Sequence, residues 1–159
     1  MYRVTKEWEV SGFTGRGGLN APWGVAVDGD NDVWVANFGA MGIDQVYTTA
    51  CISRLAGEGS PSGQPVGTAL TPDTGYTLKT GGDPVTLPDG SLLYDHAMEP
   101  CKCPLMRLTA VQIDAAGNVW ACNNWKPRFG TDFPPQHGNP GGDGIVIFVG
   151  LAKPPEVVI

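Results

Sequence analysis

The sequence has little charge and no cluster of basic residues. Only 16% of its 159 residues are charged, and 10 Lys and Arg against 16 Asp and Glu give a net charge of −6. Nucleic-acid binding needs a basic footprint, so nucleic acid is excluded as a partner. The longest apolar run, Ile145–Val149, is far too short to cross a bilayer, so no membrane span is expected.

The sequence also lacks the common catalytic and targeting motifs. There is no Gly-x-Ser-x-Gly elbow, Walker loop, dinucleotide fingerprint or His-Glu-x-x-His. The acidic run Asp28–Asp32 resembles a calcium loop, but Val33 and Gly39 stand where an EF-hand needs Gly and Glu, so a turn is predicted. The first ten residues, MYRVTKEWEV, show no signal peptide, so the chain is expected to be cytoplasmic or to have lost an upstream leader.

Glycine and proline, in contrast, are abundant. There are 23 Gly and 14 Pro, together with five Trp, five Phe and four Tyr. Frequent turn residues between aromatic and β-branched residues are typical of proteins with many short strands. The fold class that we predict is therefore all-β.

Two stretches repeat each other at an offset of 86 residues (114 − 28). They are Trp23–Asn37 (WGVAVDGDNDVWVAN) and Thr109–Asn123 (TAVQIDAAGNVWACN). Apolar residues alternate up to Asp28 or Asp114, where a carboxylate can bond backbone N–H groups one or two residues on. The repeat predicts two equivalent antiparallel hairpins.

The residue types at equivalent positions fit this prediction. Asn31 and Gly117 share the turn position at which the backbone needs a positive φ, and both residue types tolerate it. Small residues such as Gly24 would let neighbouring sheets approach closely. We expect Trp34 and Trp120 to fill the space between those sheets.

Further strands are predicted around the hairpins. Third strands are expected at Cys51–Leu55 and Gly144–Val149. The stretch Glu7–Val10 is expected to be the closing strand of a preceding unit, and Asp83–Tyr94 a small hairpin around Pro88-Asp89-Gly90.

The repeat carries a known family pattern. Pro22–Asp28 (PWGVAVD) and Gly117–Trp120 (GNVW) resemble the blade signature of NHL-type β-propellers, and are most similar to the bacterial subgroup related to streptogramin (virginiamycin B) lyase. The first copy departs from that signature at Asn31-Asp32, and the second lacks the initial Pro-x-Gly. The resemblance implies an incomplete β-propeller of about two blades, in a bacterial protein that is extracytoplasmic or secreted.

The spacing of the copies suggests the domain organisation. An offset of 86 residues is twice the usual blade period of about 40–45, which favours a long loop-rich insertion over a degenerate blade. We expect the end of a preceding blade (1–18), a blade (19–56), the insertion (57–105), a second blade (106–150) and a tail (151–159). Two blades leave apolar sheet faces exposed, so the expected partners are the remaining propeller blades or further copies of the chain.

Residues that follow the second strand of each hairpin form the predicted ligand-binding surface. They are Asn37, Asn123, Asn124, Trp125, Lys126 and Arg128. Strand-end loops open toward one face of a propeller and often carry function. The alternative is that the asparagines only cap the ends of the strands.

Histidines and cysteines supply the remaining candidates. His96 and His137 are the only histidines and hence the candidate catalytic residues. Cys51, Cys101 and Cys103 are candidates for a disulfide; the spacing does not match a zinc site, and free thiols are the other interpretation.

The sequence is compatible with three functions. The favoured one is a non-catalytic binding or scaffolding propeller segment that contacts a protein, peptide or glycan and needs no cofactor. The alternative, implied by the resemblance, is a metal-dependent carbon–oxygen lyase that opens a cyclic depsipeptide with a histidine base and a divalent ion such as Mg²⁺. A purely structural segment is the third.

Overall fold

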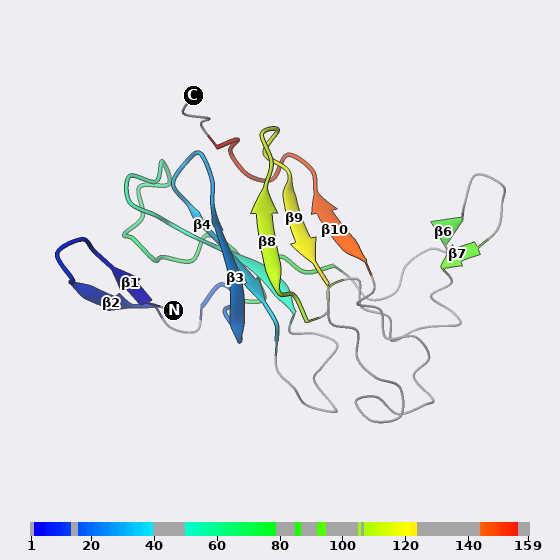
Figure 1. Ribbon diagram of the computed structural model, residues 1–159, viewed down its shortest axis with the longest axis horizontal. Coiled ribbons are helices and arrows are strands. Elements are labelled where there is room, and N and C mark those ends of the chain that lie inside the picture. Colours follow the sequence, from blue (N-terminus) through cyan, green and yellow to red (C-terminus); the bar gives the residue numbers. More distant parts are fainter. Residues whose placement is uncertain are drawn as a thin grey trace.

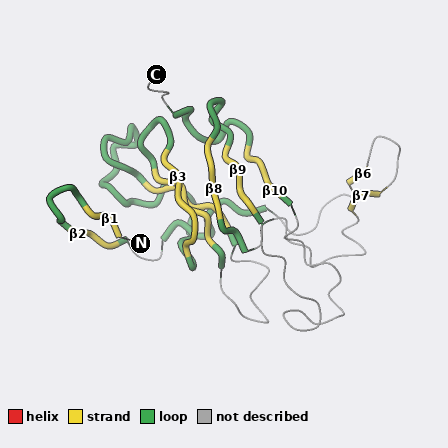
Figure 2. The backbone as a smooth tube through the Cα atoms, viewed as in Figure 1, coloured by secondary structure: helices red, strands yellow, loops and turns green. Residues whose placement is uncertain are grey.

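The computed structural model describes residues 2–13, 16–39, 50–78, 105, 107–123 and 144–155, and the backbone of residues 85–86 and 92–94. These residues form strands and loops, and none of them is helical (Figures 1 and 2). The prediction of an all-β fold is confirmed.

Two three-stranded antiparallel sheets form the centre of the molecule. The first has the order β3 (Pro22–Val27), β4 (Val33–Asn37), β5 (Cys51–Leu55), and the second the order β8 (Ala110–Ile113), β9 (Val119–Cys122), β10 (Ile145–Phe148). Both predicted hairpins and both predicted third strands are confirmed.

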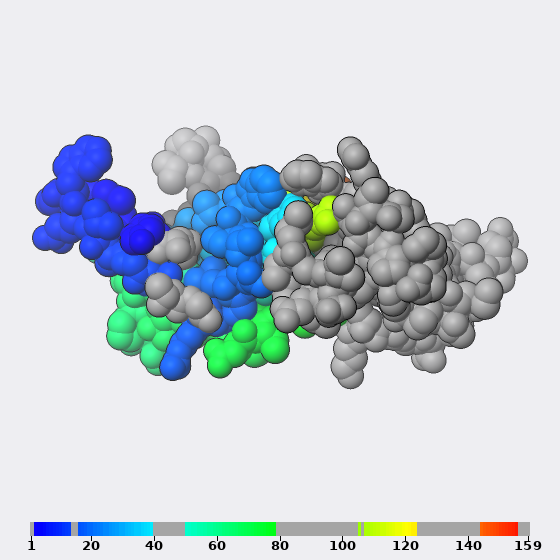
Figure 3. Space-filling model, turned by 90° about the horizontal axis from the view of Figure 1, so that it is seen from below, coloured from blue at the N-terminus to red at the C-terminus, as the bar shows by residue number. Residues whose placement is uncertain are grey.

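Two shorter hairpins accompany these sheets. β1 (Tyr2–Val4) pairs with β2 (Val10–Gly12) in a hairpin that projects from the described part of the molecule (Figure 3). The strand predicted at Glu7–Val10 is wrong in extent, because Thr5 N–H donates to the carbonyl of Glu9 and closes a turn there. β6 (Val85–Thr86) and β7 (Leu92–Tyr94) pair with each other and confirm the hairpin predicted within Asp83–Tyr94.

The turns at the tips of the two main hairpins have the same geometry. In the first, the N–H of Asn31 donates to the carbonyl of Asp28 at 3.0 Å, and in the second Gly117 donates to Asp114 at 2.9 Å. Asn31 has a φ of 62° and Gly117 one of 80°. The predicted positive φ is therefore present at both equivalent positions.

Asp28 organises the first turn with both of its carboxylate oxygens. Oδ1 accepts from the backbone N–H groups of Asp30 and Asp32, at 3.0 and 2.9 Å. Oδ2 accepts from the indole Nε1 of Trp34 at 2.8 Å. The carboxylate thus locks the turn and fixes the orientation of the tryptophan on the next strand, a bond that the sequence pattern did not predict.

Asp114 repeats this arrangement in the second turn. Its oxygens accept from the N–H groups of Ala116 and Asn118 and from Trp120 Nε1 at 2.9 Å. The side-chain amide of Asn118 adds a further bond at 2.8 Å. The indole bond, followed by those of Asn118, lowers the pKa of Asp114 to about 2.

The two sheets pack face to face, with β3 lying against β8 (Figure 2). Trp34 is fully buried between them, as predicted, and packs in one cluster with Val111, Val119 and Ala121. Trp120 is 38% exposed, so the prediction that it also lies between the sheets is wrong. The side of the first sheet that carries Trp34 packs on the side of the second sheet that carries Val111, Val119 and Ala121. Trp120 lies on the opposite side of the second sheet and therefore faces away from the first sheet.

Gly24 lies at a close approach of the two sheets. A Cβ atom on Gly24 would lie 2.8 Å from Ala110 Cα and 2.9 Å from the carbonyl oxygen of Thr109. The contacted atoms belong to the backbone and cannot move aside independently. The predicted role of Gly24 in close sheet approach is confirmed.

We therefore expect Gly24→Val to destabilise the fold by about 2 to 3 kcal/mol, because the added methyl groups push β3 away from β8. The matched control is Gly144→Val, since a Cβ at Gly144 meets no atom within 4 Å and that change should cost less than about 0.5 kcal/mol. Urea unfolding followed by circular dichroism measures both. Equal stability of the two variants would contradict the packing of β3 on β8.

Two further segments join these elements. The carbonyl of Lys153 accepts from Gly29 N–H, and the N–H of Ala152 donates to Gly117, so residues 152–153 bridge the two hairpin tips, as Figure 1 shows. Along the other edge of the first sheet, residues 68–76 bond to β5 through the pairs Ile52–Tyr76 and Leu55–Ala69. This edge lies within the stretch that the sequence assigns to the insertion.

Candidate functional site

The predicted strand-end surface contains buried asparagines. Asn37 is fully buried; its Oδ1 accepts from Asn20 N–H at 3.0 Å, and its amide donates to the Ser53 hydroxyl at 2.9 Å and to the Cys51 carbonyl at 3.1 Å. Asn123, at the equivalent position, is 6% exposed. Asn37 therefore acts as a cap of the strand end, and neither side chain presents a surface to a ligand.

The other predicted site residues lie outside the described residues. This holds for the rest of the strand-end surface, for both candidate catalytic histidines and for two of the candidate disulfide cysteines: Asn124, Trp125, Lys126, Arg128, His96, His137, Cys101 and Cys103.

The acidic turn of the first hairpin binds an arginine from β5. Arg54 Nη2 lies 2.6 Å from Asp32 Oδ2, and 3.8 Å from carboxylate oxygens of both Asp28 and Asp30. Its guanidinium carbon also lies 5.3 Å from the centre of the Trp34 ring. The cation of this turn is thus an arginine of the chain itself, which agrees with the prediction of a structural turn.

Cys51 has a free and buried thiol. Its Sγ donates to the carbonyl of Gly18 at 3.1 Å. Burial raises the pKa of this thiol to about 11, although hydrogen bonds from Asn37 and Ser53 act in the opposite direction. The thiolate is the reactive form, so Cys51 should be inert near neutral pH.

We expect iodoacetamide at pH 8 to leave Cys51 unmodified in the folded protein and to modify it fully in denaturant without reductant. Because its folded pKa of about 11 exceeds the unfolded value of 9.0, stability should also fall as pH rises through that interval. Peptide mass mapping measures the modification. If Cys51 resisted labelling in denaturant until a reductant was added, it would be in the disulfide that the sequence leaves open.

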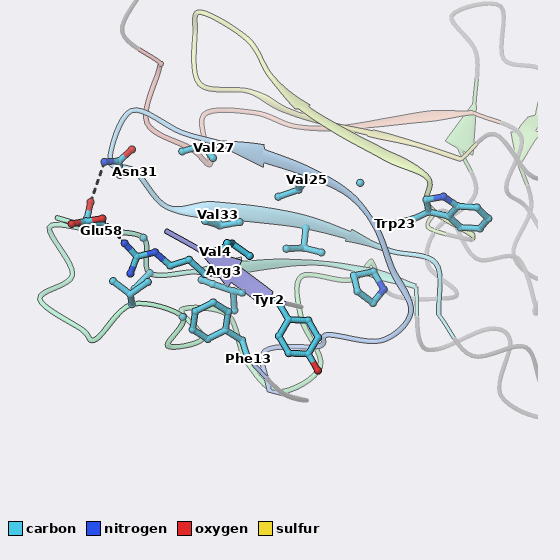
Figure 4. A pocket seen from close by; sticks show the side chains of 18 residues that line it. Tyr2, Arg3, Val4, Phe13, Trp23, Val25, Val27, Asn31, Val33 and Glu58 are labelled. Carbon is cyan, nitrogen blue, oxygen red and sulfur yellow. Dashed lines mark hydrogen bonds and ion pairs between the residues drawn. The ribbon is translucent and has the colours of Figure 1, made fainter. Parts of the chain in front are cut away.

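An apolar groove lies on the outer face of the first sheet. It encloses about 680 Å³ (Figure 4). One wall is the sheet surface at Val25, Val27 and Val33, and the other is formed by Tyr2 and Val4 of the β1–β2 hairpin. Val25 and Val27 in this wall are 61% and 51% exposed.

Polar contacts close one end of this groove. Arg3 of β1 forms an ion pair with Glu58, and the Asn31 side chain donates to the carbonyl of Glu58 at 3.0 Å (Figure 4). Phe13 packs against Gly67, where a Cβ would collide with its ring. Together these contacts hold the β1–β2 hairpin beside the sheet. At the other end Trp23, at a β-bulge in β3, packs against Phe38 with the two rings tilted by 49° and their centres 4.7 Å apart.

The sequence did not predict this groove. Its sheet wall was visible as the alternation Val25, Val27, Val33, but the repeat alone does not say which of two apolar faces is covered. The contact between Arg3 and Glu58 joins residues 55 positions apart and leaves no local signal.

Comparisons with known proteins add no relative. No family model, no curated protein and no solved structure matches the chain. Within the described ranges, no three His, Cys, Asp or Glu side chains are grouped so that they could hold a metal. In the same ranges there is also no helix of a length and apolarity that would span a membrane.

Proposed function

We propose that the chain is a segment of an NHL-type β-propeller that acts in binding or scaffolding without catalysis. The observation that carries this proposal is the equivalence of the two sheets. They share strand order, register, turn geometry and the hydrogen bond from tryptophan to aspartate. One sheet also packs on the other face to face. Repetition of a small sheet by stacking is the architecture of a propeller.

The chemistry of the repeated residues supports a structural use of both hairpins. The carboxylate oxygens of Asp28 and Asp114 accept hydrogen bonds from N–H groups of the turn and from indoles. The side-chain amide of Asn37 donates hydrogen bonds at the end of the strand. A scaffold of this kind positions the loops between its strands, and such loops are where binding residues concentrate. The residues that follow β9 in the sequence, among them Trp125, Lys126 and Arg128, are the first candidates for contact with a protein, peptide or glycan.

The lyase alternative concerns His96 and His137, which lie outside the described residues, and no described residue favours it. Incubation of a cyclic depsipeptide with the protein and Mg²⁺ tests it directly. We expect no ring opening, whereas peptide and glycan arrays should give binding that Trp125→Ala abolishes and Ala115→Lys, on an exposed turn, retains. Mg²⁺-dependent ring opening that is lost in His96→Ala or His137→Ala would overturn the proposal.

A further inference from the structure

Each sheet has two faces that differ in their side chains, and the two sheets meet through one face of each kind. We call the side that carries the tryptophan the tryptophan face, and the opposite side the valine face. In the observed interface the tryptophan face of the first sheet packs against the valine face of the second. The first comprises Gly24, Ala26, Trp34, Ala36, Ile52 and Arg54, and the second Val111, Ile113, Val119, Ala121, Val146 and Phe148.

The surfaces left open belong to the same two kinds of face: the β3 part of the valine face of the first sheet, and the tryptophan face of the second sheet. On the first sheet the valine face is open at β3, where Val25 is 61% and Val27 51% exposed. These residues are equivalent to Val111 and Ile113, which pack toward the first sheet.

On the second sheet the tryptophan face is open. Trp120 is 38%, Ile145 63% and Ile147 42% exposed. Strand register makes Ile145 equivalent to Ile52, because these residues pair with Cys122 and Ala36, which lie 86 positions apart. Ile147 is equivalent to Arg54 in the same way, and Gln112 to Ala26, so the open face, like its buried counterpart, has one polar residue beside its apolar ones.

We infer that a second copy of this chain docks here, with the tryptophan face of its second sheet on the valine face of the first sheet of its neighbour. This inference rests on the proposed function, because it extends the stacking of equivalent sheets. A second copy is the occupant that we favour because one chain presents both kinds of face that it already joins internally, the valine face being open at β3. The apolar faces are of the kind that monomeric proteins seldom leave uncovered.

The groove on the first sheet provides a place for Trp120 of the second copy. The open part of the valine face lies at β3, whereas Val35 and Leu55 are already buried. Trp120 of the incoming copy would enter the groove beside Val25 and Val27, with Tyr2 and Val4 of the β1–β2 hairpin on its far side (Figure 4). The contact is head-to-tail, so it builds closed rings or open chains of copies, not a symmetric pair.

The test uses one lysine substitution on each face of the full chain. Ile147→Lys disrupts the tryptophan face and Val25→Lys the valine face; both positions are exposed, so each variant should fold as the wild type does by circular dichroism. Sedimentation velocity over a wide concentration range should detect assembly of the wild type. Each variant alone should associate at least about tenfold more weakly. Ala115→Lys carries the same added charge on an exposed turn and should assemble like the wild type.

Mixing the two variants separates head-to-tail from symmetric association. An equimolar mixture contains one intact tryptophan face and one intact valine face, so it should form a dimer that does not grow further. Association of Val25→Lys alone at wild-type strength would overturn the inference. So would a wild type that stays monomeric at all concentrations, including one whose groove binds a small apolar dye without assembling.

The proposed function stands or falls by a different result. If the wild type is monomeric but Gly24→Val is far less stable than Gly144→Val, and the loop variant Trp125→Ala loses binding, the stacked scaffold remains and only the second copy is excluded. If Gly24→Val is as stable as its control, the stacking itself is wrong, and both proposals fail together.

Discussion

Trp34→Ala is expected to destabilise the protein by about 4 kcal/mol, whereas Trp120→Ala should cost about 1 kcal/mol or less. The two residues are equivalent in sequence, and each donates its indole N–H to an aspartate, at 2.8 and 2.9 Å. They differ in their surroundings. Trp34 is fully buried between the sheets and also stacks on Tyr76, with ring centres 6.0 Å apart, while Trp120 is 38% exposed.

Urea unfolding at low protein concentration measures this difference, because association between copies would otherwise cover Trp120. Trp34→Phe and Trp120→Phe serve as matched variants: each keeps an aromatic ring but removes the hydrogen bond to the aspartate together with part of the indole volume. At the 38% exposed position 120 the loss should come mainly from the hydrogen bond, whereas at buried Trp34 the cavity adds to it, so Trp34→Phe should cost more than Trp120→Phe. Similar losses for the two alanine variants would mean that Trp120 is buried in solution, contrary to the observed stacking.

This pair of tryptophans also marks the limit of what the sequence predicts. The hairpins, their turns and the third strands follow from local features: alternation, an aspartate at the strand end, and a residue that tolerates positive φ at Asn31 or Gly117. Close approach at Gly24 was likewise foreseeable, because only a small residue fits where two backbones meet. Whether a given Trp is buried depends on which sheet lies next to it, and identical motifs carry no information on that.

Other features could not be predicted for related reasons. Residues 68–76 bond along β5 through two isolated pairs separated by a turn at Pro72–Gly75, so they lack the alternation of a regular strand. Asn37 has the residue type of a ligand contact as well as of a cap, and only its burial distinguishes the two. Of the β1–β2 hairpin, the sequence predicted only a strand near its second half. The turn between the strands was not predicted because Trp8, and not a glycine, has the positive φ of 64° there.

Arg54→Ile is expected to destabilise the protein by about 3 kcal/mol, a loss that a second substitution should largely reverse. Arg54 contacts Asp32 through both Nη2 and Nε, at 2.6 and 2.9 Å. The side chains of Asp32 and Asp28 are 1% and 0% exposed, so removal of the guanidinium leaves two buried carboxylates without a cation. Loss of one partner from a buried ion pair typically costs about 3 to 5 kcal/mol.

In the second sheet the turn aspartate is stabilised by an asparagine and not by an arginine. Asn118 and Ile147 occupy the positions of Asp32 and Arg54, and the Asn118 amide donates to Asp114 Oδ2 at 2.8 Å without any arginine. The double variant Asp32→Asn/Arg54→Ile therefore transfers a neutral pair that already functions in this chain. Asn at position 32 keeps an oxygen for the N–H of Gly57, which now donates to Asp32 Oδ1 at 3.4 Å.

We expect the double variant to recover at least half of the loss, and Asp32→Asn alone to be destabilised because Arg54 then loses its nearest carboxylate. Urea unfolding of the two single variants and the double variant gives the coupling between the positions. A double variant no more stable than Arg54→Ile would mean that the two hairpin tips are not interchangeable. Recovery would mean that the aspartate–tryptophan turn is a transferable unit whose carboxylate is stabilised either by the charge of an arginine from the third strand or by a hydrogen bond from an asparagine of its own hairpin.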